Sequence, residues 1–101
     1  MIVRHWKGTT SKTTAAPYLQ HLEEDTFQIL NQIDGFIDAK ALRKDKVDGV
    51  EFVVISTWDS MEAVKKFAGE NPALAVVPDK AKEYLQSFDE HVDHYEVVLK
   101  A

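Results

Sequence analysis

The segment from Gly49 to Phe67 constrains the fold of this chain more than any other. It begins with a run of consecutive apolar residues, Phe52–Ile55, and the strand that this run predicts ends at Trp58. A strand with apolar side chains on both faces needs one layer packed above it and another below. In a chain of 101 residues, the second layer could have to come from another molecule.

A helix is expected directly after this strand. Asp59 is predicted as its N-cap, and Glu62, three residues later, is predicted as the capping-box partner. Gly69 marks the expected end of the helix. The predicted buried stripe comprises Met61, Val64, Phe67 and Ala68.

The remaining elements follow from apolar periodicity and turn residues. A helix is expected to begin near Thr14 and to stop before Gly35, and another is expected to start at Pro78. The predicted strands are Ile2–Lys7, Phe36–Lys44, Glu51–Trp58 and about His91–Leu99. The predicted inner faces are Leu19, Leu22, Ile29, Leu30 and Ile33 for the first helix, and Ala81, Tyr84, Leu85 and Phe88 for the last.

This order, β-α-β-β-α-β with an extra helical turn before the last helix, is the ferredoxin-like order of the α+β class. We expect residues 1–101 to form one domain, with a four-stranded antiparallel sheet and both long helices on one face. Strand alternation predicts an apolar opposite face made of Val3, Ile37, Ala39, Ala41, Val53, Ile55, Val97 and Leu99. Such a patch predicts a homodimer packed through its sheet faces, and the alternative is a monomer with a bare sheet.

Composition narrows the range of partners. The chain has 12 Lys and Arg against 17 Asp and Glu, a net charge of -5, which disfavours nucleic acid or an anionic membrane as a partner. It has no cysteine, which excludes disulfides and thiolate chemistry. There is no apolar signal region at the N-terminus and no apolar run long enough to cross a membrane, so we expect a cytoplasmic protein.

The sequence resembles the antibiotic biosynthesis monooxygenase family of the dimeric α+β barrel superfamily, over nearly its whole length. The resemblance rests on FVVISTWDSMEAVKKFAGEN, AVVPDKAKEYL and HYEVV, and on the opening RHWKG. It implies the fold described above. Its signatures are diffuse, so the activity is implied less directly than the fold.

The resemblance also implies site residues. Trp58 matches a tryptophan of the polyketide-oxidising members, but Val54 and Val64 stand where those members have an asparagine and a tyrosine. The heme-degrading members use an asparagine, a tryptophan and a histidine. This chain has Trp6, Phe67 and Val77 at the matching places, so the histidine that would bind iron is missing.

Parity along the strands predicts a pocket between sheet and helices. Arg4, Trp6, Val54, Ser56 and Trp58 would face the helices if the register of the family holds. The tryptophans could sandwich a planar ligand, or they could simply fill the core. The predicted walls that bind substrate are Trp6, Val54, Phe67 and Tyr84, together with Trp58.

The candidate catalytic residues in this pocket are His94, Arg4 and Trp58. His94 is the candidate general base, and either His94 or Arg4 could handle the proton or stabilise an anion. A hydrogen-bonded structural histidine is the alternative for His94. The cluster DEHVDH suggests a metal site, but His91 and His94 would point to opposite faces of a strand, so we expect no metal.

The function predicted from these residues is a cofactor-independent monooxygenase that oxidises a small planar aromatic molecule, such as a phenol, anthrone or hydroquinone. The four glycines are dispersed and form no dinucleotide or phosphate-binding fingerprint, so no cofactor is expected. The alternatives are a non-catalytic or stress-related dimeric binding protein of the same fold and a proton-transfer isomerase.

Overall fold

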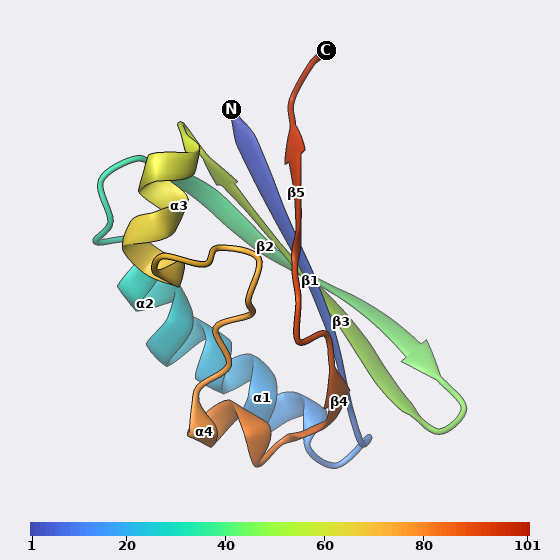
Figure 1. Cartoon of the computed structure of the whole chain (residues 1–101). Helices are drawn as coiled ribbons and strands as arrows, with labels where there is room; N and C mark the ends of the chain where they lie inside the picture. Colours follow the sequence, from blue (N-terminus) through green and yellow to red (C-terminus); the bar gives the residue numbers. More distant parts are fainter.

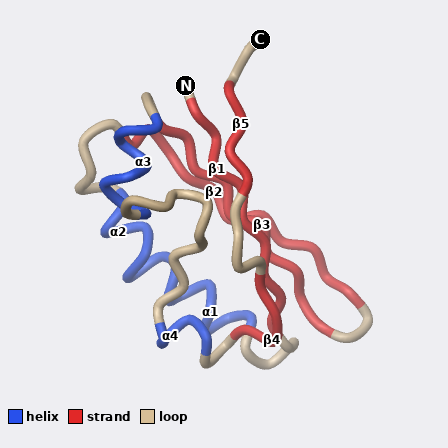
Figure 2. The backbone as a smooth tube through the Cα atoms, in the orientation of Figure 1, coloured by secondary structure: helices blue, strands red, loops and turns tan.

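A computed structural model describes all 101 residues as an antiparallel sheet with its helices packed on one face (Figures 1 and 2). The strands are β1 (Ile2–Thr10), β2 (Phe36–Lys46), β3 (Gly49–Trp58), β4 (Leu85–Phe88) and β5 (Asp93–Glu96). The helices are α1 (Ala15–His21), the π-helical segment η1 (Leu22–Thr26), α2 (Phe27–Leu30), α3 (Met61–Ala68) and α4 (Asp79–Lys82). The three segments α1, η1 and α2 follow one another without a break and form one long helix. No helix is long and apolar enough to cross a membrane.

The sheet confirms the predicted ferredoxin-like architecture. Its order is β2-β3-β1-β4, and β5 also pairs with β1. β4 pairs with the second half of β1, at Gly8–Thr10, whereas β5 pairs with the first half, at Ile2–His5. The sheet thus has five strands but is four strands wide, because β4 and β5 together fill the place of the single last strand that we predicted.

The prediction of a long last helix was wrong. The helix starts after Pro78 as expected, but α4 ends at Lys82, and a tight turn follows in which the Tyr84 N–H donates to the Ala81 carbonyl. Leu85–Phe88 then forms β4 instead of continuing the helix. The reason is tertiary: β1 continues to Thr10, and its second half offers an edge on which this segment forms ladder hydrogen bonds.

The predicted face of β2 was also wrong, because of a β-bulge. The register between β2 and β3 shifts between Phe36 and Asp38, which makes Ile37 the extra residue. Beyond the bulge Ala39 pairs with Ser56 and Ala41 with Val54, and both alanines pack against the core beneath the helices. The open face of β2 instead carries alternate residues such as Leu42, which is 45% exposed.

The N-cap of α3 lies one residue later than predicted. Ser60 is the cap, and its Oγ accepts a hydrogen bond of 3.2 Å from the Ala63 N–H. The side chain of Asp59 makes no hydrogen bond, although its backbone N–H donates to the Gly35 carbonyl. Gly69 ends the helix with φ = +86°, as a glycine can without strain.

The core between sheet and helices consists of two separate clusters. One gathers around Tyr18, Leu22 and Phe52, and the other around Leu30, Trp58 and Val64. The first lies under α1 and α4, and the second under α2 and α3. Phe27 packs against both clusters, and a small cavity remains between them.

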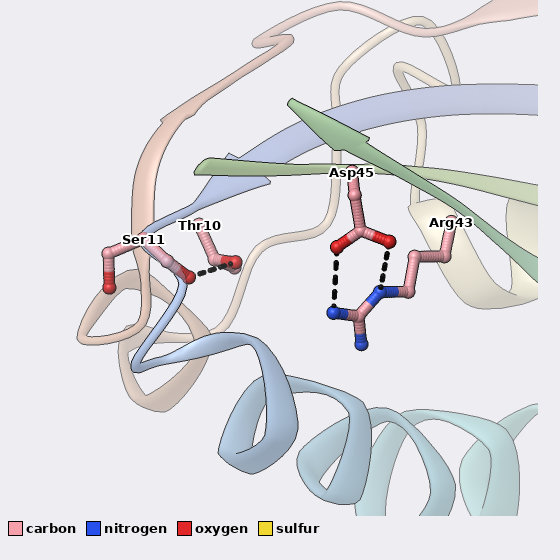
Figure 3. A network of polar contacts seen from close by, with 4 residues as sticks. All are labelled: Thr10, Ser11, Arg43 and Asp45. Carbon is pink, nitrogen blue, oxygen red and sulfur yellow. Dashed lines mark hydrogen bonds and ion pairs between the residues drawn. The ribbon is translucent and has the colours of Figure 1, made fainter. Parts of the chain in front are cut away.

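Polar contacts lie at the end of the sheet where β1 and β2 stop (Figure 3). Thr10 Oγ1 donates to the Ser11 carbonyl at 2.8 Å, and Arg43 Nη2 pairs with Asp45 Oδ1 at 2.9 Å. Arg43 lowers the pKa of Asp45, mainly through this hydrogen bond. Because both ion-pair partners are largely exposed, the pair contributes little to stability.

Candidate functional site

A cavity of about 60 Å³ lies between the two core clusters, under the long helix and the segment that precedes α4. The sheet contributes Arg4, Trp6, Val54 and Ser56 from β1 and β3, as predicted from strand parity. The helices and the covering segment contribute Tyr18, Leu22, Thr26, Leu30, Phe67, Val76, Val77, Pro78, Ala81 and Val92. The cavity is therefore mostly apolar, with few polar groups.

Arg4 is the only charged residue of this lining and is 5% exposed. Its guanidinium donates to the Pro72 carbonyl and, at 3.0 Å, to the Leu74 carbonyl, and it lies 5.9 Å from the centre of the Phe67 ring. No carboxylate pairs with it. Burial lowers the pKa of Arg4 to about 10, which still leaves the side chain charged at neutral pH. The structure thus holds a buried positive charge at the cavity with no negative partner.

His94 lies beside Arg4 on the neighbouring strand β5, but it does not line the cavity. Its Nε2 is 3.0 Å from Arg4 Nη1. Because a guanidinium can only donate, Nε2 must accept and the ring hydrogen is on Nδ1. Burial, and then the charge of Arg4, lower the pKa of His94, so the imidazole is neutral at pH 7.

Of the aromatic rings that the sequence predicted for the wall, Trp6 and Phe67 line the cavity, and they pack against different core clusters, Trp6 against the first and Phe67 against the second. Trp6 Nε1 donates to the Asp89 carbonyl at 2.9 Å, and the Trp6 ring lies 6.4 Å from that of Tyr18. The ring also covers Gly8: a Cβ atom at Gly8 would be 2.5 Å from Trp6 Cη2. A glycine two residues along the strand therefore makes room for this tryptophan.

Two of the predicted wall residues do not reach the cavity. Trp58 is fully buried behind it, where its Nε1 donates to Ser56 Oγ at 2.9 Å and its ring stacks on Phe67 at 6.0 Å. Tyr84 packs at the edge of the first cluster, 6.5 Å from the ring of His21. Of the predicted residues, the structure brings Arg4, Trp6, Val54 and Phe67 together at the cavity, with Trp58 and His94 in contact with members of its wall.

Tyr18 and Thr26 line the cavity but were not predicted from the sequence. The stripe Tyr18, Leu22, Thr26 and Leu30 has a spacing of four residues, whereas apolar periodicity favoured Leu19 and Ile29, which are 39% and 48% exposed. The wide turn of η1 compensates for the drift that an ideal α-helix gives to residues four apart. The spacing of four, starting from Tyr18, was the signal that could have revealed this face.

Heme, which the family resemblance raises as a possible ligand, does not fit these residues. Val77, at the place of the missing histidine, lines the cavity with an apolar side chain. No group of three or more His, Cys, Asp or Glu side chains is placed to hold a metal ion.

Comparison with known proteins identifies the family to which this chain belongs. The model of the antibiotic biosynthesis monooxygenase family matches residues 1–77. No curated protein matches the chain in sequence.

Solved structures of the same fold cover almost the whole chain. An antibiotic biosynthesis monooxygenase from Bacillus cereus aligns with a TM-score of 0.69 and 23% identity, over 99% of this chain and 93% of that one. The N63A mutant of SnoaB, a cofactor-independent oxygenase from Streptomyces nogalater, aligns with a TM-score of 0.69 and 14% identity, over 98% of this chain and 95% of that one. The heme-degrader MhuD from Mycobacterium tuberculosis aligns with a TM-score of 0.62 and 20% identity, over 100% of this chain and 99% of that one. At these identities the structures show the shared fold, and the match of the family model over three quarters of the chain shows that this protein belongs to the antibiotic biosynthesis monooxygenase family.

Proposed function

We propose that this protein is a cofactor-independent monooxygenase that oxidises a small planar aromatic molecule with an acidic O–H or C–H group. The observation that carries the proposal is the buried Arg4 guanidinium, which has no carboxylate partner and borders an apolar, aromatic-walled cavity. A positive charge in a site of low polarity favours formation of a substrate anion. The family includes SnoaB, described as a cofactor-independent oxygenase, which supports the same reaction class.

In this proposal the substrate itself reduces oxygen. Its anion passes an electron to O₂, and the two radicals combine to form a peroxide on carbon. Loss of water then leaves a carbonyl. For an anthrone-like CH₂ group the balance is R₂CH₂ + O₂ → R₂C=O + H₂O, so that one oxygen atom enters the product and the other leaves as water.

The residues have separate tasks in this scheme. Arg4 stabilises the anion, and Trp6, Val54 and Phe67 hold the aromatic body. His94 accepts the proton once Arg4 moves its Nη1–H from Nε2 to the substrate oxygen, because Nε2 is engaged by Arg4 before that. Trp58 acts from behind the wall by fixing the Ser56 hydroxyl and the Phe67 ring.

The cavity of about 60 Å³ is too small for a two- or three-ring substrate, since ligand pockets usually measure about 300–1,000 Å³. The segment that covers it, from Gly69 to Pro78, has no helix and no named strand, although Leu74 makes a single bridge to His91. We propose that this segment shifts to admit the ligand. Oxidation inside the closed site then keeps water away from the radical and peroxide intermediates.

The proposal also includes a cytoplasmic homodimer. On the open face of the sheet, β3 contributes Val53 and Ile55, β1 contributes Val3, and β5 contributes Tyr95, which is 57% exposed. Such a face is suited to pack against its copy in a second molecule. The alternative, a non-catalytic binding protein, is favoured by Val54 and Val64, which replace the polar residues of polyketide-oxidising members.

The decisive experiment is oxygen uptake by the metal-free protein with a panel of anthrones, naphthols and hydroquinones. We expect protein-dependent uptake above the autoxidation blank, and a loss of at least about tenfold in Arg4→Gln because a charge-assisted hydrogen bond is removed. The Trp58→Phe variant should also lose turnover while staying folded. Uptake at the blank level across the panel would favour the binding protein, and product formed without oxygen uptake would favour the isomerase.

A further inference from the structure

The hydrogen bonds of Arg4 leave part of its guanidinium free. The side chain has five N–H donors. Nη1 uses both of its hydrogens, one for the Pro72 carbonyl and one for His94 Nε2, and Nη2 uses one for the Leu74 carbonyl. One N–H on Nε and one on Nη2 remain without a partner.

Nε and Nη2 are neighbouring nitrogens on one edge of the guanidinium. That edge is the fork with which arginine binds a carboxylate through two parallel hydrogen bonds. The other three N–H groups bond the Pro72 carbonyl, the Leu74 carbonyl and His94 Nε2. These hydrogen bonds orient the guanidinium plane between β5 and the covering segment. Two of these contacts come from the covering segment, so they hold this orientation of the side chain while the segment is closed.

Arg4 lines the cavity, and its unpaired Nε is not fully buried. His21 Nε2 is the only fully buried side-chain nitrogen or oxygen without a hydrogen-bond partner, so Arg4 Nε, which also has no partner, keeps some exposed surface. Arg4 as a whole is 5% exposed and lines the cavity, whose volume of about 60 Å³ is enough for a carboxylate group. The charge of the site is also unbalanced, because no acidic side chain lines the cavity.

We propose that this edge is a carboxylate-binding subsite, and that the ligand of this protein is an aromatic acid whose carboxylate binds Arg4 through Nε and Nη2. The inference rests on the proposed function for the aromatic body of the ligand, and it adds a fixed negative charge that a simple phenol or anthrone lacks. The ring then extends from Arg4 towards Val54 and Trp6, which lie next along β3 and β1.

The test compares aromatic acids with their neutral amides of the same shape. Binding of benzoate and 2-naphthoate, and of benzamide and 2-naphthamide, is measured by isothermal titration calorimetry. We expect each acid to bind at least about tenfold more tightly than its amide, because hydrogen bonds to a charged group are the stronger ones. Equal affinity of acid and amide, or no saturable binding of either acid at millimolar concentration, would overturn the proposal.

Two variants then test whether Arg4 causes the preference for acids over amides. Arg4→Gln should bring acid and amide to equal affinity, whereas Arg43→Gln removes the same charge far from the cavity and should keep the preference. A preference that persists in a folded Arg4→Gln variant would also contradict the proposal. If Arg4→Gln does not fold, the comparison of acid with amide in the wild-type protein still decides.

Oxygen uptake separates this inference from the proposed function. Selective binding of the acids without uptake of oxygen by any hydroxylated aromatic acid supports the subsite and contradicts the monooxygenase. Uptake with neutral phenols, in a protein that binds acid and amide equally, supports the monooxygenase and contradicts the subsite.

Discussion

At the scale of single residues, the contact between Arg4 and His94 joins the cavity to the outer strand. His94 accepts from Arg4 Nη1 only while it is neutral. A protonated His94 would face the guanidinium at about the same distance with a like charge and no lone pair. Asp93, the neighbour of His94 on β5, raises the pKa of His94. This effect is smaller than the lowering by burial and by the charge of Arg4. The hydrogen bond between Arg4 and His94 is therefore lost when a falling pH protonates His94.

The sign of this dependence follows from the lowered pKa of His94. The unfolded chain, with a histidine pKa of about 6.5, binds a proton at a higher pH than the folded protein does. Neutral His94 thus makes its full contribution to the free energy of unfolding above about pH 6.5. This contribution is lost as the pH falls from there towards the pKa of His94 in the folded protein. We expect urea unfolding to show a smaller drop in stability between pH 7.5 and 5.5 for His94→Gln than for the wild type.

The glutamine amide oxygen can still accept from Arg4, so this variant keeps the contact and removes the titration. His5, His21 and His91 are present in both proteins, so the comparison isolates His94. An equal drop in the two proteins would show that the folded environment of His94 does not disfavour its charged form.

At the scale of elements, the start of α3 offers a test of one local contact. Ser60 Oγ accepts from the Ala63 N–H, whereas the Asp59 side chain makes no hydrogen bond. We expect Ser60→Ala to lower the free energy of unfolding by about 1 kcal/mol, the usual cost of losing an N-cap. Asp59→Ala, the matched control, should stay within about 0.5 kcal/mol of the wild type in urea unfolding. A larger cost for Asp59→Ala would mean that the cap is the residue predicted from the sequence.

The sequence predicts these elements well where the signal is local. The apolar run of β3, Pro17 in the first turn of the long helix and Gly69 at the end of α3 each act on their own neighbours, and each prediction is confirmed. The prediction fails where the structure of a segment depends on pairing with a strand far away in the sequence. Leu85–Phe88 has a helical pattern but pairs with β1.

The same distinction explains the candidate site. Parity along β1 and β3 placed Arg4, Trp6 and Val54 at the cavity, because these strands are regular. A one-residue bulge in β2 inverted the prediction for Ala39 and Ala41, and the π turn brought Tyr18 inward instead of Leu19. Both irregularities add a residue to the repeat of an element, which a fixed period cannot represent.

At the scale of the whole molecule, the two faces of the sheet have different tasks. The helix side contains the cavity, bounded by two core clusters that do not merge. The open side carries half-buried Val53 and Ile55 at its centre, with Leu42 beside Val53 on β2. Since only the first side has helices, the proposed dimer would remove the apolar centre of the second side from water.

We therefore expect the wild-type protein to sediment as a dimer in analytical ultracentrifugation and Ile55→Asp to sediment as a monomer. An aspartate there would bring a charge into the centre of the interface, where it has no counter-charge and would lose its water. Glu70→Lys, on an exposed loop on the helix side, is the control and should remain a dimer.

The same variant tests whether the cavity is independent of the dimer. The lining of the cavity lies on the helix side of the sheet and comes from one chain, so folded, monomeric Ile55→Asp should keep the preference for aromatic acids over their amides. A dimeric Ile55→Asp would contradict packing through the sheet faces. Loss of the acid preference in a folded monomer would show instead that the second molecule stabilises β1, and with it the position of Arg4.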